Sequence, residues 1–256
     1  MDLNQLNIQL NNFDSIPLDV LEQKNLLSRF DTKFISSSKN LERIFEILEE
    51  VYNILEINGR RIFRYKNLYY DTDDFLFYFQ HHNGKKDRQK VRFRQYSSTD
   101  SCFFEIKHKH NNYTTKQRLM VNDIDFELKE GASRMVEDAI KLNPDKLSPK
   151  IWVLYDRITL LHKELPEKIT IDTNIQFKTG NEVKKFPEIA IFEVKHKKLN
   201  SYSEIIHSIE RFNLIKKVNF SKYCMGIIVS DYPVKYNRFK PKLINIFKVA
   251  EKKDGL

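Results

Sequence analysis

Positively charged side chains recur at every second position in three successive segments between residues 90 and 118. Residues alternate between the two faces of a β-strand, so this spacing predicts three strands whose cations share one face of a sheet. The intervening positions include Val91, Phe93 and Ile106, which predict an apolar opposite face. The charged face carries one carboxylate, Glu105, and these cations: Lys90, Arg92, Arg94, Lys107, Lys109, Lys116 and Arg118.

So many like charges on one face of the sheet restrict what can lie against that face. Two like charges about 6 Å apart repel by about 3 kcal/mol at an effective dielectric constant of about 20. The face is therefore either open to water, as the outer face of an antiparallel sheet, or matched to a polyanion. Three successive strands with the same sign favour the polyanion.

The charge of the whole chain points the same way. The sequence has 256 residues, 44 Lys and Arg against 35 Asp and Glu, and a net charge of +9. This balance favours acidic partners such as phosphorylated small molecules, polyphosphate, nucleic acid or an anionic membrane surface. With six glycines the chain has no GxxxxGK[ST] or GxGxxG loop, so side chains must hold any phosphate.

Two cysteines, Cys102 and Cys224, lie among apolar neighbours and indicate buried free thiols rather than a cysteine-rich metal site. The first ten residues are polar and lack a signal-peptide hydrophobic region, and the apolar runs are too short to span a bilayer. We therefore expect a cytoplasmic protein without a transmembrane segment.

No linker rich in Gly, Ser or Pro divides the chain, so we expect one domain over residues 1–256, ending in a basic tail over 235–256. The dipeptide at residues 58–59, Asn-Gly, predicts a β-hairpin between residues 51–57 and 61–70. Apolar spacing predicts a helix over residues 125–142.

Residues 104–109 (FEIKHK) recur almost unchanged at residues 192–197 (FEVKHK). Each copy places one Glu and two Lys on one face of a strand. About eight candidate strands, with connections typical of antiparallel pairing, predict an α+β fold: an eight-stranded antiparallel β-barrel with flanking helices. With charged faces inward, its interior would be a basic tunnel holding a few carboxylates.

Such an interior suits phosphoryl chemistry. Lys and Arg neutralise phosphoryl oxygens, and carboxylates can hold Mg²⁺ or Mn²⁺, which bridges phosphate oxygens. Glu193 and Glu105 are the candidate ligands. The alternative for each is an ion pair with a neighbouring cation.

At this point the sequence resembles a known family. It is similar to the VTC domain, the catalytic module of vacuolar transporter chaperone polyphosphate polymerases, which belongs with the CYTH proteins to the triphosphate tunnel metalloenzymes. The similarity covers about residues 26–230. It rests on the ordered segments 29–34 (RFDTKF), 69–72 (YYDT), 91–96 (VRFRQY), 104–107 (FEIK), 116–118 (KQR), 155–157 (YDR), 171–174 (IDTN), 192–195 (FEVK) and 220–223 (FSKY).

The resemblance implies a polyphosphate polymerase-like transferase that moves the terminal phosphoryl group of ATP onto polyphosphate, with Mn²⁺ or Mg²⁺. It implies a metal site at Glu193, and Glu105 is the second candidate from its position on the charged face. The implied catalytic residues are Arg92, Arg94, Lys107, Arg157 and Lys222. The substrate-binding residues that it implies are Lys33, Lys116, Tyr155 and Lys168, and the alternation of charge along the strands adds Lys90, Lys109, Arg118 and Lys195.

The chain departs from the family pattern at two places. Lys168 stands where the family usually has Arg, which keeps the charge but loses the bidentate fork. CYTH proteins begin with a Glu-x-Glu-x-Lys strand, whereas this chain offers one carboxylate, Asp31, before Lys33. The chain resembles a stand-alone prokaryotic form, and a membrane-protein partner could recruit it peripherally.

Other functions stay open at this stage. They are a metal-dependent tripolyphosphatase, a non-catalytic polyphosphate or triphosphate binder, and a nuclease in which Asp172, Glu193 and Lys195 form a D…ExK set. We expect no nucleic-acid partner, because most aromatic residues alternate to the face opposite the cations. His108 and His196 also fall on that opposite face, where we expect packed histidines rather than ligands.

Overall fold

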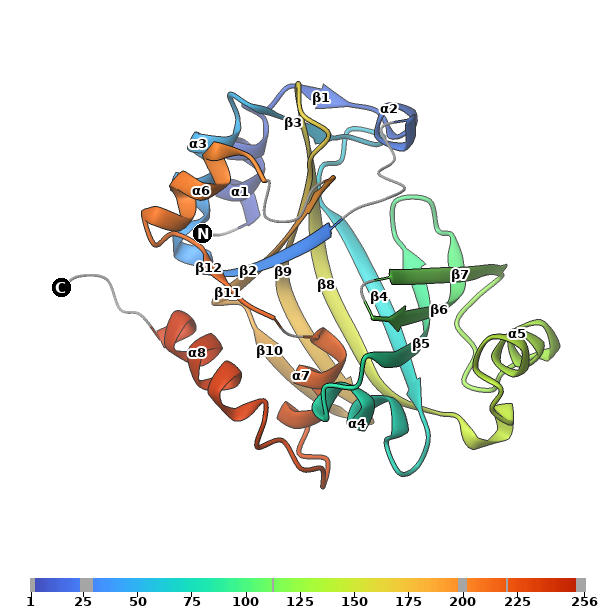
Figure 1. The fold of residues 1–256 in the computed structure, drawn as a ribbon. Helices are drawn as coiled ribbons and strands as arrows, with labels where there is room; N and C mark the ends of the chain where they lie inside the picture. Colours follow the sequence, from blue (N-terminus) through green and yellow to red (C-terminus); the bar gives the residue numbers. More distant parts are fainter. Residues whose placement is uncertain (1–2, 24–29, 112, 198–201, 220, 252–256) are drawn as a thin grey trace.

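The structure, a computed structural model, describes residues 3–23, 30–111, 113–197, 202–219 and 221–251 (Figure 1). Its strands are β1 (Ser15–Ile16), β2 (Phe30–Ser37), β3 (Tyr52–Leu55), β4 (Phe63–Asp71), β5 (Asp87–Tyr96), β6 (Cys102–His110), β7 (Tyr113–Val121), β8 (Ser148–His162), β9 (Lys168–Thr179), β10 (Glu182–Phe186), β11 (Ile189–His196) and β12 (Lys216–Lys217). Its α-helices are α1 (Leu3–Leu10), α2 (Leu18–Gln23), α3 (Leu41–Leu48), α4 (Leu76–His82), α5 (Glu130–Ile140), α6 (Glu204–Arg211), α7 (Lys222–Val229) and α8 (Lys240–Glu251). Two short 3-10 helices cover Ser38–Asn40 and Pro144–Lys146.

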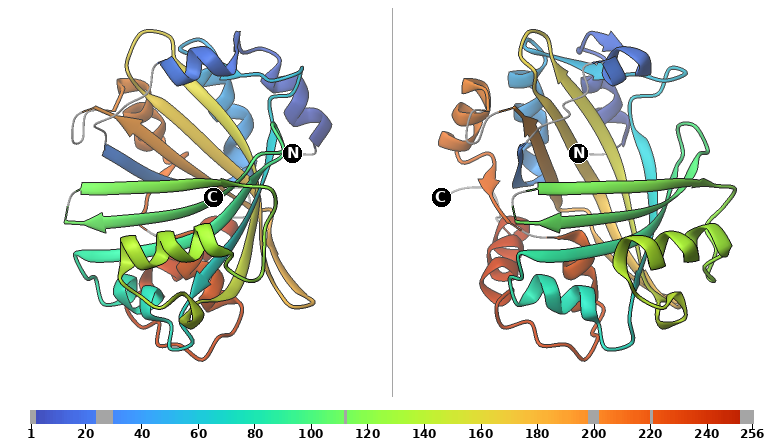
Figure 2. Two further views of the ribbon diagram at one scale, coloured as in Figure 1. Left: turned by 90° about the vertical axis from the view of Figure 1, so that its right-hand side faces the viewer. Right: turned by 45° about the vertical axis from the view of Figure 1, so that its right-hand side comes forward.

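The strands form one sheet in the order β12-β2-β11-β9-β8-β4-β5-β6-β7. Every pairing along this path is antiparallel. The three strands predicted between residues 90 and 118 are confirmed as β5, β6 and β7. The sheet is strongly curved, so that β6 and β7 cross over its concave side (Figures 1 and 2).

The predicted closed barrel of eight strands is not confirmed. Over the described ranges the sheet has twelve strands, and no ladder joins β7 to β2 or β12. One reason is that β12 occupies the outer edge of β2, where Lys216 and Lys217 pair with Ile35 and Phe34. The mixed α+β class is as expected, but the sheet is open.

The hairpin predicted around residues 58–59 is wrong. Asn58 and Gly59 do adopt positive φ angles of 51° and 70°, and Ile57 bridges Arg60. Beyond this turn the chain diverges: β3 pairs with β1 and β8, and β4 pairs with β5 and β8. Pairing with β8 buries Tyr52 in an apolar core, which outweighs the local turn signal.

The concave face of the sheet changes character along the strands. On β2 its residues are Asp31, Lys33 and then Ile35, and on β11 the same change runs from Glu193 to Ile191. Helix α7 packs on the apolar end together with α8, which forms most of the basic tail. The two helices therefore bury the apolar end of the concave face.

Close packing of α7 requires a glycine. A Cβ at Gly226 would lie 2.6 Å from Phe177 Cδ1 and 2.8 Å from Ile151 Cδ1, which is closer than carbon atoms approach. The helix therefore lies directly on β8 and β9, and its first residue, Lys222, reaches the charged end of the concave face.

The convex face of the sheet carries two further cores. Helices α1, α3 and α6 cover β2, β9 and β11, and helix α5 covers β5 and β6. Helix α5 is shorter than predicted, because Lys141 ends it in the left-handed conformation and the chain enters it only at Glu130. Across the described residues no helix has the length and apolar character needed to cross a bilayer.

Asp71 at the end of β4 joins three elements in the interior. Its Oδ1 accepts hydrogen bonds from the backbone N–H groups of Thr72 and Phe77, at 2.8 and 2.9 Å. Its Oδ2 accepts from Tyr78 N at 2.9 Å and from the hydroxyl of Tyr223 on α7 at 2.5 Å. The carboxylate therefore fixes α7 relative to α4.

Candidate functional site

Arg92 lies in the charged part of the concave face and is fixed by its cross-strand neighbours. Its direct ladder partners are Tyr69 on β4 and Glu105 on β6. Its Nε and Nη2 donate to Glu105 Oε2 at 2.8 and 2.6 Å, and its Nη1 donates to the Tyr69 hydroxyl at 2.8 Å. The register of three strands therefore sets the direction of this guanidinium.

Glu105 is almost fully buried, at 1% exposure, among cations. Lys116 on β7 forms an ion pair with its Oε1, and Arg94 Nε lies 3.9 Å from its Oε2. Burial alone would raise the pKa of Glu105, but Arg92, Arg94 and Lys116 hold it well below its ordinary value. Glu105 thus has the ion pairs with neighbouring cations that were the alternative to metal binding. A metal-binding role for Glu105 stays a prediction.

Arg94 belongs to a group of polar and aromatic side chains next to this ion pair. Its Nε donates to Asn67 Oδ1 at 2.7 Å and its Nη2 to the Tyr155 hydroxyl at 3.1 Å. The ring of Tyr155 stacks on Tyr65 with 5.4 Å between centroids. The guanidinium of Arg157 lies 4.7 Å from the Tyr65 centroid.

Arg157, Asp172 and Lys222 form a second buried ion cluster. Arg157 Nε and Nη2 donate to the two oxygens of Asp172 at 2.6 and 2.8 Å, and Lys222 Nζ donates to Oδ2 at 2.5 Å. Burial alone would raise the pKa of Asp172, but these two cations lower it below its ordinary value. Arg157 and Lys222, both predicted from the resemblance, thus bind the same carboxylate. From the sequence, Asp172 had a role only in the nuclease alternative.

Glu193 occupies the opposite part of the concave face, on β11. Lys195 Nζ donates to its Oε1 at 3.2 Å, and Lys33 on β2 is its direct ladder partner. Burial alone would raise its pKa, but Lys195, Lys33, Lys107 and Arg157 hold it well below its ordinary value. The side chain is 17% exposed, against 1% for Glu105, so this ionised carboxylate is partly open to solvent.

Lys90 and Lys107 are directly opposed across β5 and β6. Burial lowers the pKa of Lys107 to about 8. The negative charge of Glu193 acts against this shift, and the positive charge of Lys33 adds to it. Burial and the neighbouring Lys33 lower the pKa of Lys90 well below its ordinary value. Like charges opposite each other on a sheet are destabilising, so this arrangement favours an anion between them.

The other predicted substrate-binding residues lie on β6, β7 and β9, and of these Lys116 belongs to the Glu105 ion cluster. Lys109 is half-buried, whereas Lys116 and Arg118 on the edge strand β7 are exposed. The Arg118 guanidinium lies 5.0 Å from the ring centroid of Phe103. Lys168 is half-buried at the start of β9, where it is the ladder partner of Lys195.

A family comparison matches residues 28–230 of the chain, most of its length, to the VTC domain. The chain belongs to the VTC domain family. Its matched region contains every residue that we predicted as a site residue. A search of curated proteins found no match to this VTC domain.

Solved structures share the fold at low sequence identity. A candidate adenylate cyclase from Bacillus halodurans is 14% identical with a TM-score of 0.53, and the match covers 76% of this chain and 94% of that chain. A candidate adenylyl cyclase from Hippeastrum, described as having a dominant triphosphatase activity, is 11% identical with a TM-score of 0.54. That match covers 81% of this chain and 99% of that one. Identities this low establish the likeness of fold alone.

The carboxylates of this VTC domain fit a hard divalent cation at one position better than at the others. Glu105 and Asp172 are each buried and bonded to at least two cations. Glu193 is ionised and accessible, and one carboxylate suffices for Mg²⁺ or Mn²⁺ when phosphate oxygens and water complete the coordination. Its surroundings therefore fit the predicted metal.

Sequence reasoning missed several polar residues of the concave face. Tyr65, Asn67 and Tyr69 come from β4, and alternation along residues 61–70 could have placed them on one face. His81 on α4 lies near Lys90 and Lys33, and burial together with these cations strongly lowers its pKa. Its imidazole is therefore neutral at pH 7, and we find no sequence signal for its position.

The prediction for the two histidines is half right. His196 is buried, at 1% exposure, and its Nε2 lies 2.9 Å from Thr32 Oγ1. His108 is instead partly exposed and hydrogen-bonded to Asp87. The apolar face of β6 ends before this residue, because helix α5 covers the sheet only as far as Ile106.

Proposed function

We propose that this VTC domain transfers the terminal phosphoryl group of ATP to a polyphosphate chain held on the charged part of its concave face. The observation that carries the proposal is the composition of that face. Four carboxylates, Asp31, Glu105, Asp172 and Glu193, stand among a larger number of cations from β2, β5, β6, β7, β8, β11 and α7. Such an excess of positive charge is matched by a polyanion.

Each part of the face has a role in this reaction. Arg92, Arg94 and Arg157 hold phosphoryl oxygens, and their own hydrogen bonds keep them in place before substrate arrives. Glu193 would hold Mn²⁺ or Mg²⁺, which supplies charge neutralisation on the transferred group. Lys33, Lys90 and Lys107 would stabilise the negative charge of the chain that receives it.

Hydrolysis of a triphosphate is the second candidate, because the triphosphatase activity described for the Hippeastrum protein occurs on the same fold. The same residues would hold the substrate, and water would be the acceptor. A binder without catalysis is the third candidate, because the cations alone suffice for binding. We also propose that the protein is cytoplasmic and that a membrane-protein partner carries the product away.

Incubation of the purified protein with ATP and Mn²⁺, followed by gel analysis of polyphosphate and assay of free phosphate, tests the proposal. Polymer formation that is lost in an Arg92→Ala/Arg94→Ala variant supports the transferase. Release of phosphate without polymer indicates the triphosphatase. Binding of tripolyphosphate with neither product overturns both enzymes and leaves the binder.

A further inference from the structure

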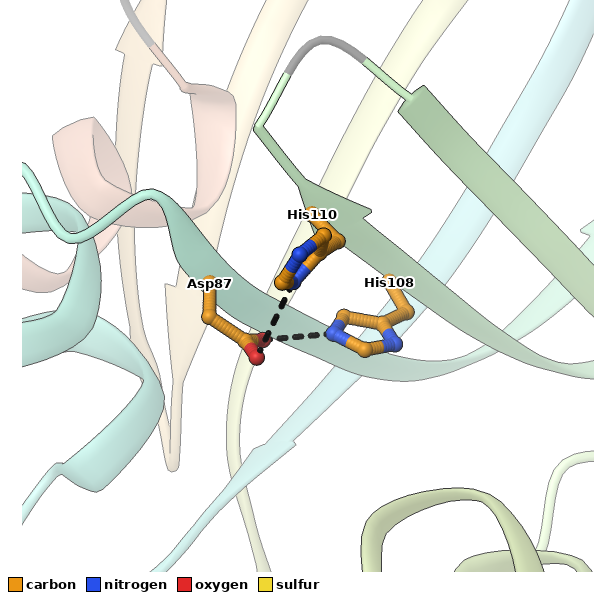
Figure 3. Close-up of side chains that lie close together, drawn as sticks. All are labelled: Asp87, His108 and His110. Atoms are coloured by element: carbon orange, nitrogen blue, oxygen red, sulfur yellow. Dashed lines mark hydrogen bonds and ion pairs between the residues drawn. The ribbon is translucent and has the colours of Figure 1, made fainter.

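Asp87, His108 and His110 form a cluster outside the charged concave face. Asp87 begins β5, and the two histidines lie near the end of β6 (Figure 3). Because side chains alternate, these residues point to the convex face, opposite Lys107 and Lys109. The cluster is therefore separate from Glu193 and from every other residue that we assign to phosphoryl transfer.

The register of the two strands brings the three side chains together. Asp87 is the direct ladder partner of His110, and His108 lies on the same face two residues earlier. Asp87 Oδ1 is 2.5 Å from His108 Nε2, and Asp87 Oδ2 is 3.4 Å from His110 Nδ1. One ligand atom from each residue lies within 4.8 Å of the other two.

We propose that Asp87, His108 and His110 bind a divalent transition metal ion such as Zn²⁺. Two imidazole nitrogens and one carboxylate oxygen form a ligand set that binds Zn²⁺, Co²⁺ and Ni²⁺ more tightly than Mg²⁺. Ligand atoms about 2.0–2.1 Å from a tetrahedral ion lie about 3.3 Å from one another, so the cluster needs only small side-chain adjustments.

The exposure of the cluster supports this site. The side chains of Asp87, His108 and His110 are 55%, 31% and 63% exposed, so an ion can enter and water can complete its coordination. The exposed side chains can also move the fraction of an ångström that separates a hydrogen-bonded pair from a metal-bridged one. Metal binding displaces the protons that join the imidazoles to Asp87.

The bound ion would connect β5 to β6 directly behind the strand positions that carry Lys90, Lys107 and Lys109. A bridge at this end of the ladder holds the opposed lysines in register against their mutual repulsion. The site would therefore stabilise the geometry of the concave face without contacting its ligand.

Titration of chelator-treated, untagged protein with Co²⁺ tests the site, because imidazole-bound Co²⁺ has a characteristic visible absorption spectrum. We expect this spectrum in the wild-type protein and in a Glu193→Gln variant. A His108→Gln/His110→Gln variant should bind Co²⁺ at least about 100-fold more weakly, since loss of an outer partner alone costs about 10–100-fold in metal affinity. An Asp87→Asn variant should show a similar loss.

A His207→Gln variant is the matched control, because His207 lies on α6 in a different part of the chain. It should bind Co²⁺ as the wild-type protein does. Absence of the spectrum in the wild-type protein, or equal binding by the His108→Gln/His110→Gln variant, would overturn the proposal. Loss of the spectrum in Glu193→Gln alone would also overturn it, since the ion would then belong to the concave face.

Discussion

The near-identical segments 104–109 on β6 and 192–197 on β11 have different surroundings in the folded chain. Glu105 lies between Arg92 on β5 and Arg118 on β7, whereas Glu193 lies between Lys33 on β2 and Thr170 on β9. The first carboxylate is buried in an ion cluster, and the second is accessible. The same six positions thus carry a buried or a partly exposed carboxylate according to the strands on either side.

The histidines of the two segments differ in the same way. His196 packs beneath Tyr202 and Phe30, while His108 lies beyond the edge of the convex core and meets Asp87. Helix cover on the convex face therefore decides whether this position is core or surface. Substitutions at matched positions of the two segments should therefore have different effects.

Replacement of Glu105 by Ala should lower the free energy of unfolding by about 3–5 kcal/mol, because Arg92, Arg94 and Lys116 would lose their shared counter-charge. Urea unfolding monitored by circular dichroism measures the change. Tripolyphosphate should restore part of the lost stability, since it supplies negative charge to the same cations.

The control for this change is Glu130→Ala, which removes the exposed pair with Arg134 and should cost less than about 1 kcal/mol. Equal stability of the Glu105→Ala variant and the wild-type protein would show that Glu105 is not a structural counter-ion. The contrast with Glu193 would then disappear.

Replacement of Glu193 by Gln should reduce phosphoryl transfer about 100-fold or more, since a metal ion supplies several kcal/mol of transition-state stabilisation. The loss of unfolding free energy should be smaller than for Glu105→Ala, because Glu193 is 17% exposed and Glu105 is 1% exposed. Steady-state turnover with Mn²⁺ and urea unfolding on the same preparation give the two values. Glu188→Gln, an exposed carboxylate near the start of β11, is the control.

The comparison is inverted if Glu193→Gln retains its turnover and Glu105→Gln loses it while still folded. In that case the buried cluster, not the accessible carboxylate, would be the metal site.

Replacement of His196 by Ala should cost about 2 kcal/mol of stability, because it leaves a space next to Tyr202 and removes the partner of Thr32. The same change at His108 should alter the free energy of unfolding by less than about 0.5 kcal/mol in metal-free protein. Thermal and urea unfolding of the two variants side by side measure this difference. Similar losses at both positions would mean that the two histidines share one environment.

The sequence predicted what is local in this fold. The alternation of residues 90–118 and of the two near-identical segments is visible without knowledge of neighbours, and β5, β6, β7 and β11 follow it. The pairing of β3 with β8 and the open edge of β7 depend on contacts between segments far apart in sequence. The surroundings of Glu105 and Glu193 depend on such contacts too, so the near-identical local sequences could not separate them.

The smallest effect that we predict concerns the lysines two residues after each glutamate. Lys195 donates to Glu193 on its own strand. Lys107 stands at the matching position beside Glu105, which is instead bonded to Arg92 and Lys116. Burial, with the repulsion of Lys33, lowers the pKa of Lys107 to about 8 from an ordinary value of 10.5. Deprotonation as the pH rises through about 8 removes one cation, and tripolyphosphate affinity should fall about tenfold between pH 7 and 9.5.

Stability should change in the opposite direction over the same range. Because the unfolded chain binds the Lys107 proton more tightly than the folded one, the contribution of this group to the free energy of unfolding rises with pH from about 8 to 10.5. A Lys107→Met variant has no such proton, so both pH dependences should be flatter than in the wild-type protein. Calorimetric titration of tripolyphosphate and urea unfolding at pH 7 and 9.5 measure the two slopes. Identical slopes in the variant and the wild-type protein would show that the Lys107 proton contributes to neither.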